Sequence, residues 1–345
     1  MIEIDGSKKS GSGTILRLSV AMAAITGQPL HIFNIRDNRP KPGLKPQHLE
    51  SVRTAARICS AELKNAKLGS SEIWFTPHKI TGGSFESKIG TAGSIPMLLI
   101  TVLPLCLFAE KTVKLHVSGG GTDVRYSPTI NYLRYVFLPL LEHMGITIDL
   151  EVHSYGYYPK GGGEVTLTVH PCESPKPLKL TEFNKIQTIQ GISVCTFLAD
   201  RKVAERQAKA ADNYLQRRGH STDIQVINDE SNPIQKGSSL VLWTKHETSV
   251  PLGADAIGER GKSSEKVGKE AAKNLHAEIS AKPTVDLHMA DLLVPYVALA
   301  EGKSVYLTRR KTDHLETNIW LAEKMLDVHF EVKKTGTLYR ITKLP

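Results

Sequence analysis

The chain repeats one pattern at three places: an amphipathic helix followed by two short strands. Apolar residues recur at helical spacing over 49–59, 130–144 and 319–326. Alternating strand-like runs lie after these helices, at 72–76, 146–152, 165–169, 328–332 and 337–342. Each unit has an apolar face that it cannot bury alone, so the units have to share a core. We therefore predict an α+β fold in which three repeated helix–sheet units of βαβαββ type surround that core.

The middle of the chain does not follow this repeat. Pro171, Pro175 and Pro177 interrupt the pattern, and from about residue 181 the sequence becomes polar and basic. The pattern there predicts strands at 192–198, 224–227 and 240–243 and helices at 201–218 and 263–279. We predict a smaller inserted α/β module of βαβββα type over 181–279. The domain built from the repeated units is then discontinuous, over 1–180 and 280–345.

The composition favours a polyanionic partner. The 345 residues carry a formal net charge of +9. A basic surface attracts nucleic acid above all, although many basic enzymes bind none. The four cysteines show no zinc-ligand spacing, so we expect reduced thiols and no structural metal.

No segment is expected to cross a membrane or to direct export. The N-terminus carries charges without the apolar run of a signal peptide. Residues 90–109 carry no charge, but Pro96 and Pro104 interrupt them, and their apolar part is shorter than the roughly 20 residues that a spanning helix needs. We expect a helix buried in the core here, in a cytoplasmic protein. The sequence does not indicate the oligomeric state.

Two basic runs near the N-terminus are candidate anion sites. Residues 6–14 are rich in glycine and serine and lead into a helix, whose N-terminal amides and dipole favour an anion. Arg36, Arg39 and Lys41 lie in a loop stiffened by prolines, and Arg17 follows one turn into the first helix. Arginine forks match phosphate geometry. A flexible turn and a solvated charged loop explain the same residues equally well.

Two glycine clusters and one histidine complete the candidate motifs. Triple glycines at 119–121 and 161–163 permit positive φ and close backbone approach, although hairpin turns use the same residues. His314 follows Asp313 and precedes an amphipathic helix. A neutral imidazole is a competent nucleophile at physiological pH, because histidine titrates near ~6.5. Taken alone, a histidine at this place is more often a surface or capping residue.

Taken together, these runs resemble the RNA 3′-terminal phosphate cyclase family over essentially the whole chain. The motifs that carry the resemblance are Asp5-Gly6, Arg39-x-Lys-Pro-Gly-Leu44, Gln47-His48, Ile89-Gly-Thr-Ala-Gly-Ser94, Gly120-Gly-Thr-Asp123, the run Tyr-Pro-Lys-Gly-Gly-Gly at 158–163, and His314-Leu-x-Thr-Asn-Ile319. Several motifs in the right order are more specific than any one of them. Tyr155 departs from the family signature, which usually has a basic residue there.

The resemblance implies a reaction in three steps. His314 attacks the α-phosphate of ATP and releases pyrophosphate. The adenylyl group then passes to the 3′-phosphate of an RNA end. The neighbouring 2′-OH finally displaces AMP and leaves a 2′,3′-cyclic phosphate. The resemblance also implies Mg²⁺ or Mn²⁺ among the ATP phosphates, and RNA 3′-phosphate ends as partners.

The functional residues of the family carry over by position. The resemblance implies ATP binding at Ser10, Thr14, Ile100, Pro128, Tyr132, His288, Met289, Ala290, Asp291 and Leu292. It implies binding of the RNA end or the triphosphate at Arg17, Arg36, Arg39, Lys41 and Gln47. The family usually has Glu at position 10, Gln at positions 14, 100 and 292, and Tyr at position 288. Ser10 removes a carboxylate expected to help hold the metal, so the metal ligands are unassigned.

Two other functions fit parts of the sequence. Cyclase-like proteins that lack the catalytic histidine act in ribosome assembly, and the weakened ATP residues fit that class whereas His314 does not. Transferases of the enolpyruvyl type share the repeated architecture but have no use for the His-Leu-x-Thr-Asn run. The sequence therefore favours an active cyclase, with a non-catalytic RNA-binding protein of ribosome assembly as the alternative.

Overall fold

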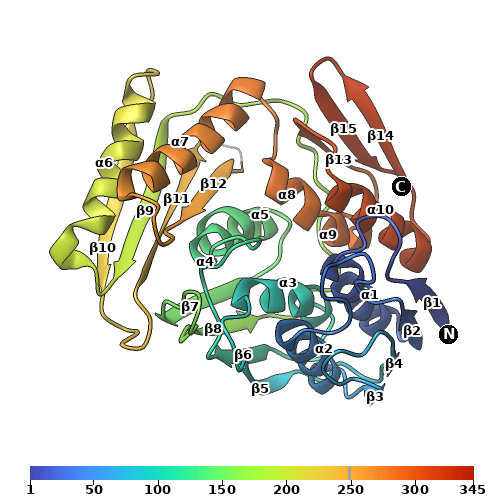
Figure 1. Ribbon diagram of the computed structural model, residues 1–345. Helices are drawn as coiled ribbons and strands as arrows, with labels where there is room; N and C mark the ends of the chain where they lie inside the picture. Colours follow the sequence, from blue (N-terminus) through green and yellow to red (C-terminus); the bar gives the residue numbers. More distant parts are fainter. Residues whose placement is uncertain (248–249) are drawn as a thin grey trace.

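The structure is a computed structural model that describes residues 1–247 and 250–345 (Figure 1). The first repeated unit comprises the N-terminal 76 residues. Its elements are β1 (Ile2–Asp5), α1 (Gly13–Thr26), β2 (Leu30–Phe33), α2 (Pro46–Ile58), β3 (Glu62–Lys64) and β4 (Ile73–Thr76). The sheet order is β1-β2-β4-β3, with β1 parallel to β2 and the other pairs antiparallel. This is the βαβαββ unit predicted from the sequence.

The second unit repeats this topology. Its elements are β5 (Gly83–Lys88), α3 (Ile95–Cys106), β6 (Val113–Ser118), α4 (Ile130–Tyr132), the π-helical segment Leu133–Phe137, α5 (Leu138–His143), β7 (Ile148–Ser154) and β8 (Glu164–Val169). The sheet order is β5-β6-β8-β7, again with the first pair parallel. The single helix predicted over 130–144 is therefore interrupted. Pro139 has no amide hydrogen for the carbonyl of Tyr135, and the amide of Leu138 bonds to Leu133 instead, which widens the turn.

The third unit is split by a long insertion. Its later elements are α8 (Leu287–Leu292), α9 (Val294–Leu299), β13 (Ser304–Thr308), α10 (Asp313–Leu326), β14 (Phe330–Thr335) and β15 (Leu338–Lys343), in the sheet order β13-β15-β14. Residues 178–180 run parallel to β13. The amide of Val305 donates to the carbonyl of Leu178, and the carbonyl of Val305 accepts from the amide of Leu180. This short segment occupies the place of the first strand, so the insertion interrupts the third unit after its first strand.

The inserted segment contains a fourth sheet. Its elements are β9 (Thr188–Thr196), the short helix Ala199–Arg201, α6 (Val203–Gln216), β10 (Thr222–Asp229), β11 (Gly237–Lys245), β12 (Gly253–Ile257) and α7 (Ser264–Ala281), with the strands in the order β10-β9-β11-β12. Leu240 and Leu242 pack under α6 and α7, whereas Val241 and Trp243 face the main core. Trp243 also stacks on Tyr135 at 4.9 Å. The domain division at residues 181 and 279 stays a prediction.

The helices of the three units meet in the middle of the molecule, and the three sheets lie outside them (Figure 1). Helix α1 contacts α2, α3 and α10, and nearly all its apolar side chains are buried. The uncharged segment at 90–109 forms α3 within this shared core, as predicted. Among the described residues, no helix has the length and apolarity needed to cross a membrane.

The two glycine clusters pack backbone against backbone. The amide of Gly119 donates to the carbonyl of Gly163 at 2.8 Å, and the amide of Gly163 donates to Gly120 at 2.8 Å. A Cβ atom on Gly156 would lie 2.3 Å from the carbonyl oxygen of Gly120. Turn geometry explains the positive φ of Gly161, but the absence of side chains here also allows two chain segments to approach closely.

Candidate functional site

A cavity of about 640 Å³ opens where segments of all three units converge. Its wall comes from α1, the loop before α2 and the first turn of α2, the first turns of α3, the loop before α4, α8, the start of α9 and the first turns of α10. The lining residues are Ser12, Gly13, Thr14, Arg17, Leu18, Ala21, Arg36, Arg39, Gln47, His48, Met97, Ile100, Thr101, Tyr126, Ser127, Pro128, His288, Asp291, Leu292, Pro295, His314 and Asn318. Segments far apart in the sequence thus share one binding space.

Helix α10 presents His314 to this cavity in its first turn. Thr312 caps the helix by accepting from the amide of Leu315 at 3.0 Å, and its hydroxyl donates to the Asp291 carboxylate at 2.6 Å. Asn318 donates to the backbone carbonyl of Asp291 at 2.8 Å. These two contacts join α10 to α8 and fix where the imidazole of His314 lies.

The imidazole of His314 also contacts helix α1. Its Nδ1 lies 3.4 Å from the hydroxyl oxygen of Thr14, which accepts from the Arg17 guanidinium at 3.2 Å. Partial burial lowers the pKa of His314, and the positive charges of Arg17 and Arg39 lower it further. The neighbouring carboxylate of Asp313 opposes this shift in pKa. The site therefore favours the neutral ring, which is the nucleophilic form.

Three arginines give the cavity a positive wall. Arg36 is held by its own loop, donating to the carbonyls of Lys41 at 2.9 Å and Gly43 at 2.8 Å. Arg39 donates to the carbonyl of Ser10 at 3.2 Å. Burial, with the charge of Arg36, lowers the pKa of Arg17 to about 10. Within the described chain none of Arg17, Arg36 and Arg39 forms an ion pair with a carboxylate, so their charges are available to an anion.

The start of helix α1 accommodates a buried histidine beside these arginines. A Cβ atom on Gly13 would lie 2.3 Å from His48 Nε2, so this close contact requires glycine. Burial lowers the pKa of His48 to about 3, and the charges of Arg17 and Arg36 add to the effect. His48 is therefore neutral at physiological pH and adds no positive charge to the wall.

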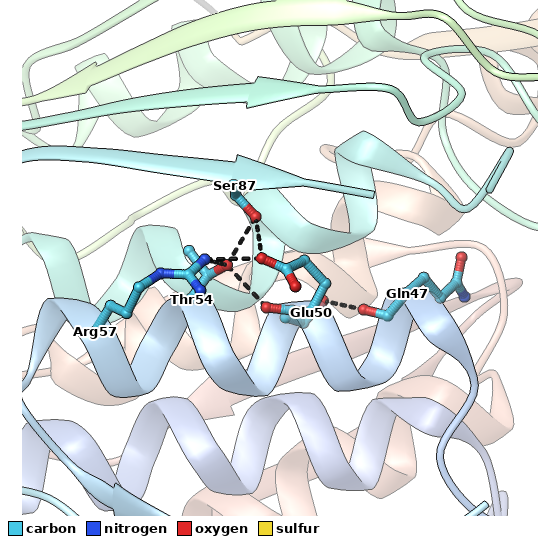
Figure 2. Close-up of polar contacts among 6 residues, drawn as sticks. Gln47, Glu50, Thr54, Arg57 and Ser87 are labelled. Carbon is cyan, nitrogen blue, oxygen red and sulfur yellow. Dashed lines mark hydrogen bonds and ion pairs between the residues drawn. The ribbon is translucent and has the colours of Figure 1, made fainter. Parts of the chain in front are cut away.

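A polar cluster joins α2 to β5 of the second unit (Figure 2). Ser87 donates to Glu50 at 2.8 Å and lies 2.9 Å from the Thr54 hydroxyl, while Arg57 donates to the same carboxylate at 2.8 Å. At the N-terminal end of the helix, the side chain of Gln47 accepts from the amide of Ser94 at 2.9 Å. The cluster therefore locks α2 against the second unit and places Gln47 on the cavity wall.

One carboxylate, that of Asp291 in α8, is among the described residues that line the cavity. Burial raises the pKa of Asp291 to about 7, although the hydrogen bond from Thr312 and the nearby His288 act in the other direction. In residues 1–247 and 250–345, no group of three or more His, Cys, Asp and Glu side chains is arranged to hold a metal ion. The donor set of the described residues does not fit a metal bound by the protein alone.

Some residues implied by the resemblance lie outside the cavity. Met289 and Ala290 are buried on the core side of α8, and Lys41 is exposed on its loop. The amide of Ser10 donates to the hydroxyl of Thr317 in α10 at 3.2 Å, and Ser10 is not among the lining residues. Tyr132 is buried, and its hydroxyl donates to the carboxylate of Asp286 at 2.7 Å. Asp286 is the residue that caps the N-terminus of α8. The remaining ATP and RNA residues implied by the resemblance line the cavity, and their roles stay predictions.

Sequence reasoning missed part of the lining. Leu18 and Ala21 follow Thr14 and Arg17 by four residues each, and Met97 precedes Ile100 by three and Thr101 by four, so periodicity could have found them. Asn318 lies four residues after His314 on the same face of α10. No local pattern marks Tyr126 or Ser127, because their position depends on how the loop at 119–129 packs.

Comparison with known proteins assigns the chain to a family. A family model described as RNA 3′-terminal phosphate cyclase matches residues 8–332. A protein of that name from Methanopyrus kandleri is 42% identical over 340 residues, covering 96% of this chain and 95% of the relative. A protein of the same name from Pyrobaculum aerophilum is 42% identical, and the alignment covers 99% of this chain and 97% of the relative. One from Methanosarcina barkeri is 43% identical, and the alignment covers 99% of each chain. The chain therefore belongs to the RNA 3′-terminal phosphate cyclase family of enzymes.

Proposed function

We propose that this chain converts the 3′-terminal phosphate of an RNA into a 2′,3′-cyclic phosphate, with ATP as co-substrate and His314 as the covalent catalyst. The observation that carries the proposal is that one cavity combines a neutral histidine with three arginines that have no carboxylate partner among the described residues. A neutral imidazole can attack phosphorus, and unpaired guanidinium groups bind the phosphates that react with it.

The chemistry requires activation of the RNA end. A terminal phosphate monoester is a dianion without a usable leaving group, so a hydroxyl cannot close the ring on it directly. Adenylylation supplies AMP as the leaving group, and covalent catalysis divides one difficult displacement into easier ones.

In the first step, Nε2 of His314 attacks the α-phosphorus of ATP. The N–P bond forms as the bond from the α-phosphorus to the bridging oxygen breaks, and pyrophosphate departs. The Thr14 hydroxyl supports the choice of nitrogen, since it lies beside Nδ1 and already accepts from Arg17. It can accept a hydrogen bond from Nδ1–H, which leaves the lone pair on Nε2.

In the second step, an oxygen of the RNA 3′-phosphate attacks the same phosphorus and the N–P bond breaks, which regenerates the imidazole. In the third, the 2′-oxygen attacks the 3′-phosphorus and AMP departs, while the hydroxyl proton passes to solvent or to a basic group of the site. Because ring closure is intramolecular, positioning provides much of the rate. The need for a 2′-OH restricts the reaction to RNA ends.

The cavity is suitable for a nucleotide. Its volume of about 640 Å³ lies within the range of roughly 300–1,000 Å³ usual for small-ligand pockets. Pro128 and His288 offer ring surfaces for the base, and Oδ1 of Asn318 is a buried acceptor without a partner among the described residues. A hydrogen-bond donor of the bound nucleotide could satisfy that oxygen. A divalent cation would then be held chiefly by the ATP phosphates.

The test offers two RNAs that both end in a 3′-phosphate, one with and one without the terminal 2′-OH. With ATP and Mg²⁺ or Mn²⁺, the first should gain a phosphatase-resistant cyclic end and the second should not. The His314→Ala variant should close neither. Equal closure of the deoxy end, or full activity of the variant, would overturn the proposal. The oligomeric state remains open, and the cytoplasmic location stays a prediction.

A further inference from the structure

Tyr126 is an exposed aromatic residue on the rim of the cavity. Its exposed fraction is 97%. Among the exposed large hydrophobic side chains of the described residues, it alone lines the cavity. Exposing a tyrosine ring to water forgoes the burial that usually stabilises an aromatic side chain. An aromatic ring kept in this place is therefore available to a ligand.

The backbone around Tyr126 is fixed in an unfavourable conformation. Tyr126 has φ of 63°, a left-handed value that residues other than glycine seldom adopt. The residues on both sides are anchored: Arg125 pairs with Glu259, and the hydroxyl of Ser127 lies 2.6 Å from that of Ser94. Strained residues held by their neighbours cluster at functional sites. The ring is therefore presented by a held loop.

The position of Tyr126 also suggests what kind of ligand it meets. A second cavity, of about 280 Å³, adjoins the first, and Tyr126 and Ser127 line both. The two cations that line the second cavity are already paired, Arg125 with Glu259 and Lys262 with Glu270. Among the described residues that line this space no cation is unpaired, and Asp255 adds a further carboxylate. A ligand that reaches Tyr126 would therefore be recognised there by ring stacking, and not by contacts between a cation and a phosphate.

We propose that Tyr126 stacks on a nucleobase of the RNA end, within its last two nucleotides. This inference rests on the proposed function, because it assumes that the RNA phosphate reaches the arginines beside His314. An aromatic ring stacks on any base without reading its sequence. A strand whose terminal phosphate lies in the first cavity leaves over its rim, and Tyr126 is the exposed aromatic residue of the described chain on that rim.

The experiment measures binding of a 5′-fluorescent RNA with a 3′-phosphate by anisotropy, without ATP. We expect Tyr126→Ala to weaken binding about 5- to 100-fold, the range expected for one lost base stack. Tyr126→Phe keeps the aromatic ring and should retain most of the wild-type affinity for the RNA. Tyr158 is 78% exposed but outside the cavity lining, so Tyr158→Ala is the matched control and should bind as wild type does.

A second RNA, abasic at its last two nucleotides, completes a thermodynamic cycle. It should bind wild type more weakly, and Tyr126→Ala should weaken it no further. If Tyr126→Ala loses the same affinity for both RNAs, or loses none for either, the stacking inference is overturned and the proposed function stays in place. Failure of wild type to bind any 3′-phosphate RNA would overturn both.

Discussion

Substituting Thr14 by Val tests whether the His314 tautomer is set by a single hydroxyl. Valine keeps the shape of threonine but removes the oxygen that lies 3.4 Å from His314 Nδ1 and accepts from Arg17 at 3.2 Å. The contact to the imidazole is long for a hydrogen bond, so its contribution belongs at the lower end of the usual range, about 0.5 kcal/mol. That corresponds to a roughly twofold slower formation of histidyl-AMP.

The assay is a single turnover of enzyme with saturating labelled ATP and no RNA, which isolates the first step. Thr14→Ser is the matched variant, because it retains the hydroxyl at the same position of α1. We expect Ser to recover most of the rate lost with Val. A rate for Val equal to that of wild type, or a loss with Ser as large as that with Val, would refute the role assigned to the hydroxyl.

Three further predictions concern charge, packing and polar contacts. Because the pKa of His314 is lowered, its neutral form should persist below pH ~6.5. Arg39→Gln should raise that pKa, so the rate of histidyl-AMP formation, measured against pH, should begin to fall at a higher pH than in wild type. Gly156→Ala should destabilise the fold by about 3 kcal/mol in urea unfolding, since its Cβ would clash with backbone atoms of two other segments. Gly90→Ala meets open space and should change little. Ser87→Ala should cost about 1–3 kcal/mol, because it leaves a carboxylate short of a donor.

The repeated architecture could be predicted because the spacing of apolar residues along the sequence indicates each helix and strand locally. The helix and strand runs at 49–59, 146–152 and 165–169 all fall within elements of the expected type or at their edges. The interruption near Tyr135 could not be predicted from the same signal, because apolar spacing alone does not reveal which amide is missing. Pro139 was the available clue.

The candidate site was predictable only where a motif marked it. His314 and the basic loop stand out in the sequence, and the structure brings them to one cavity. Tyr126 and Asn318 were both missed as site residues. The four-residue spacing from His314 could have found Asn318, whereas the position of Tyr126 depends on tertiary packing. Tyr132 is a different case: the resemblance marks it as part of the ATP site, and the structure places it outside the cavity lining, where it supports the cap of α8. Its role in ATP binding stays a prediction.

The most direct test of the account is to find AMP bonded to His314. The protein is incubated with ATP and Mg²⁺ or Mn²⁺ without RNA, digested under conditions that preserve phosphoramidates, and its peptides are weighed by mass spectrometry. The account predicts an acid-labile AMP increment on the peptide that contains His314, and none on the same peptide of His314→Ala. A wild-type protein that never gains AMP, or an increment that maps to another residue, would contradict it.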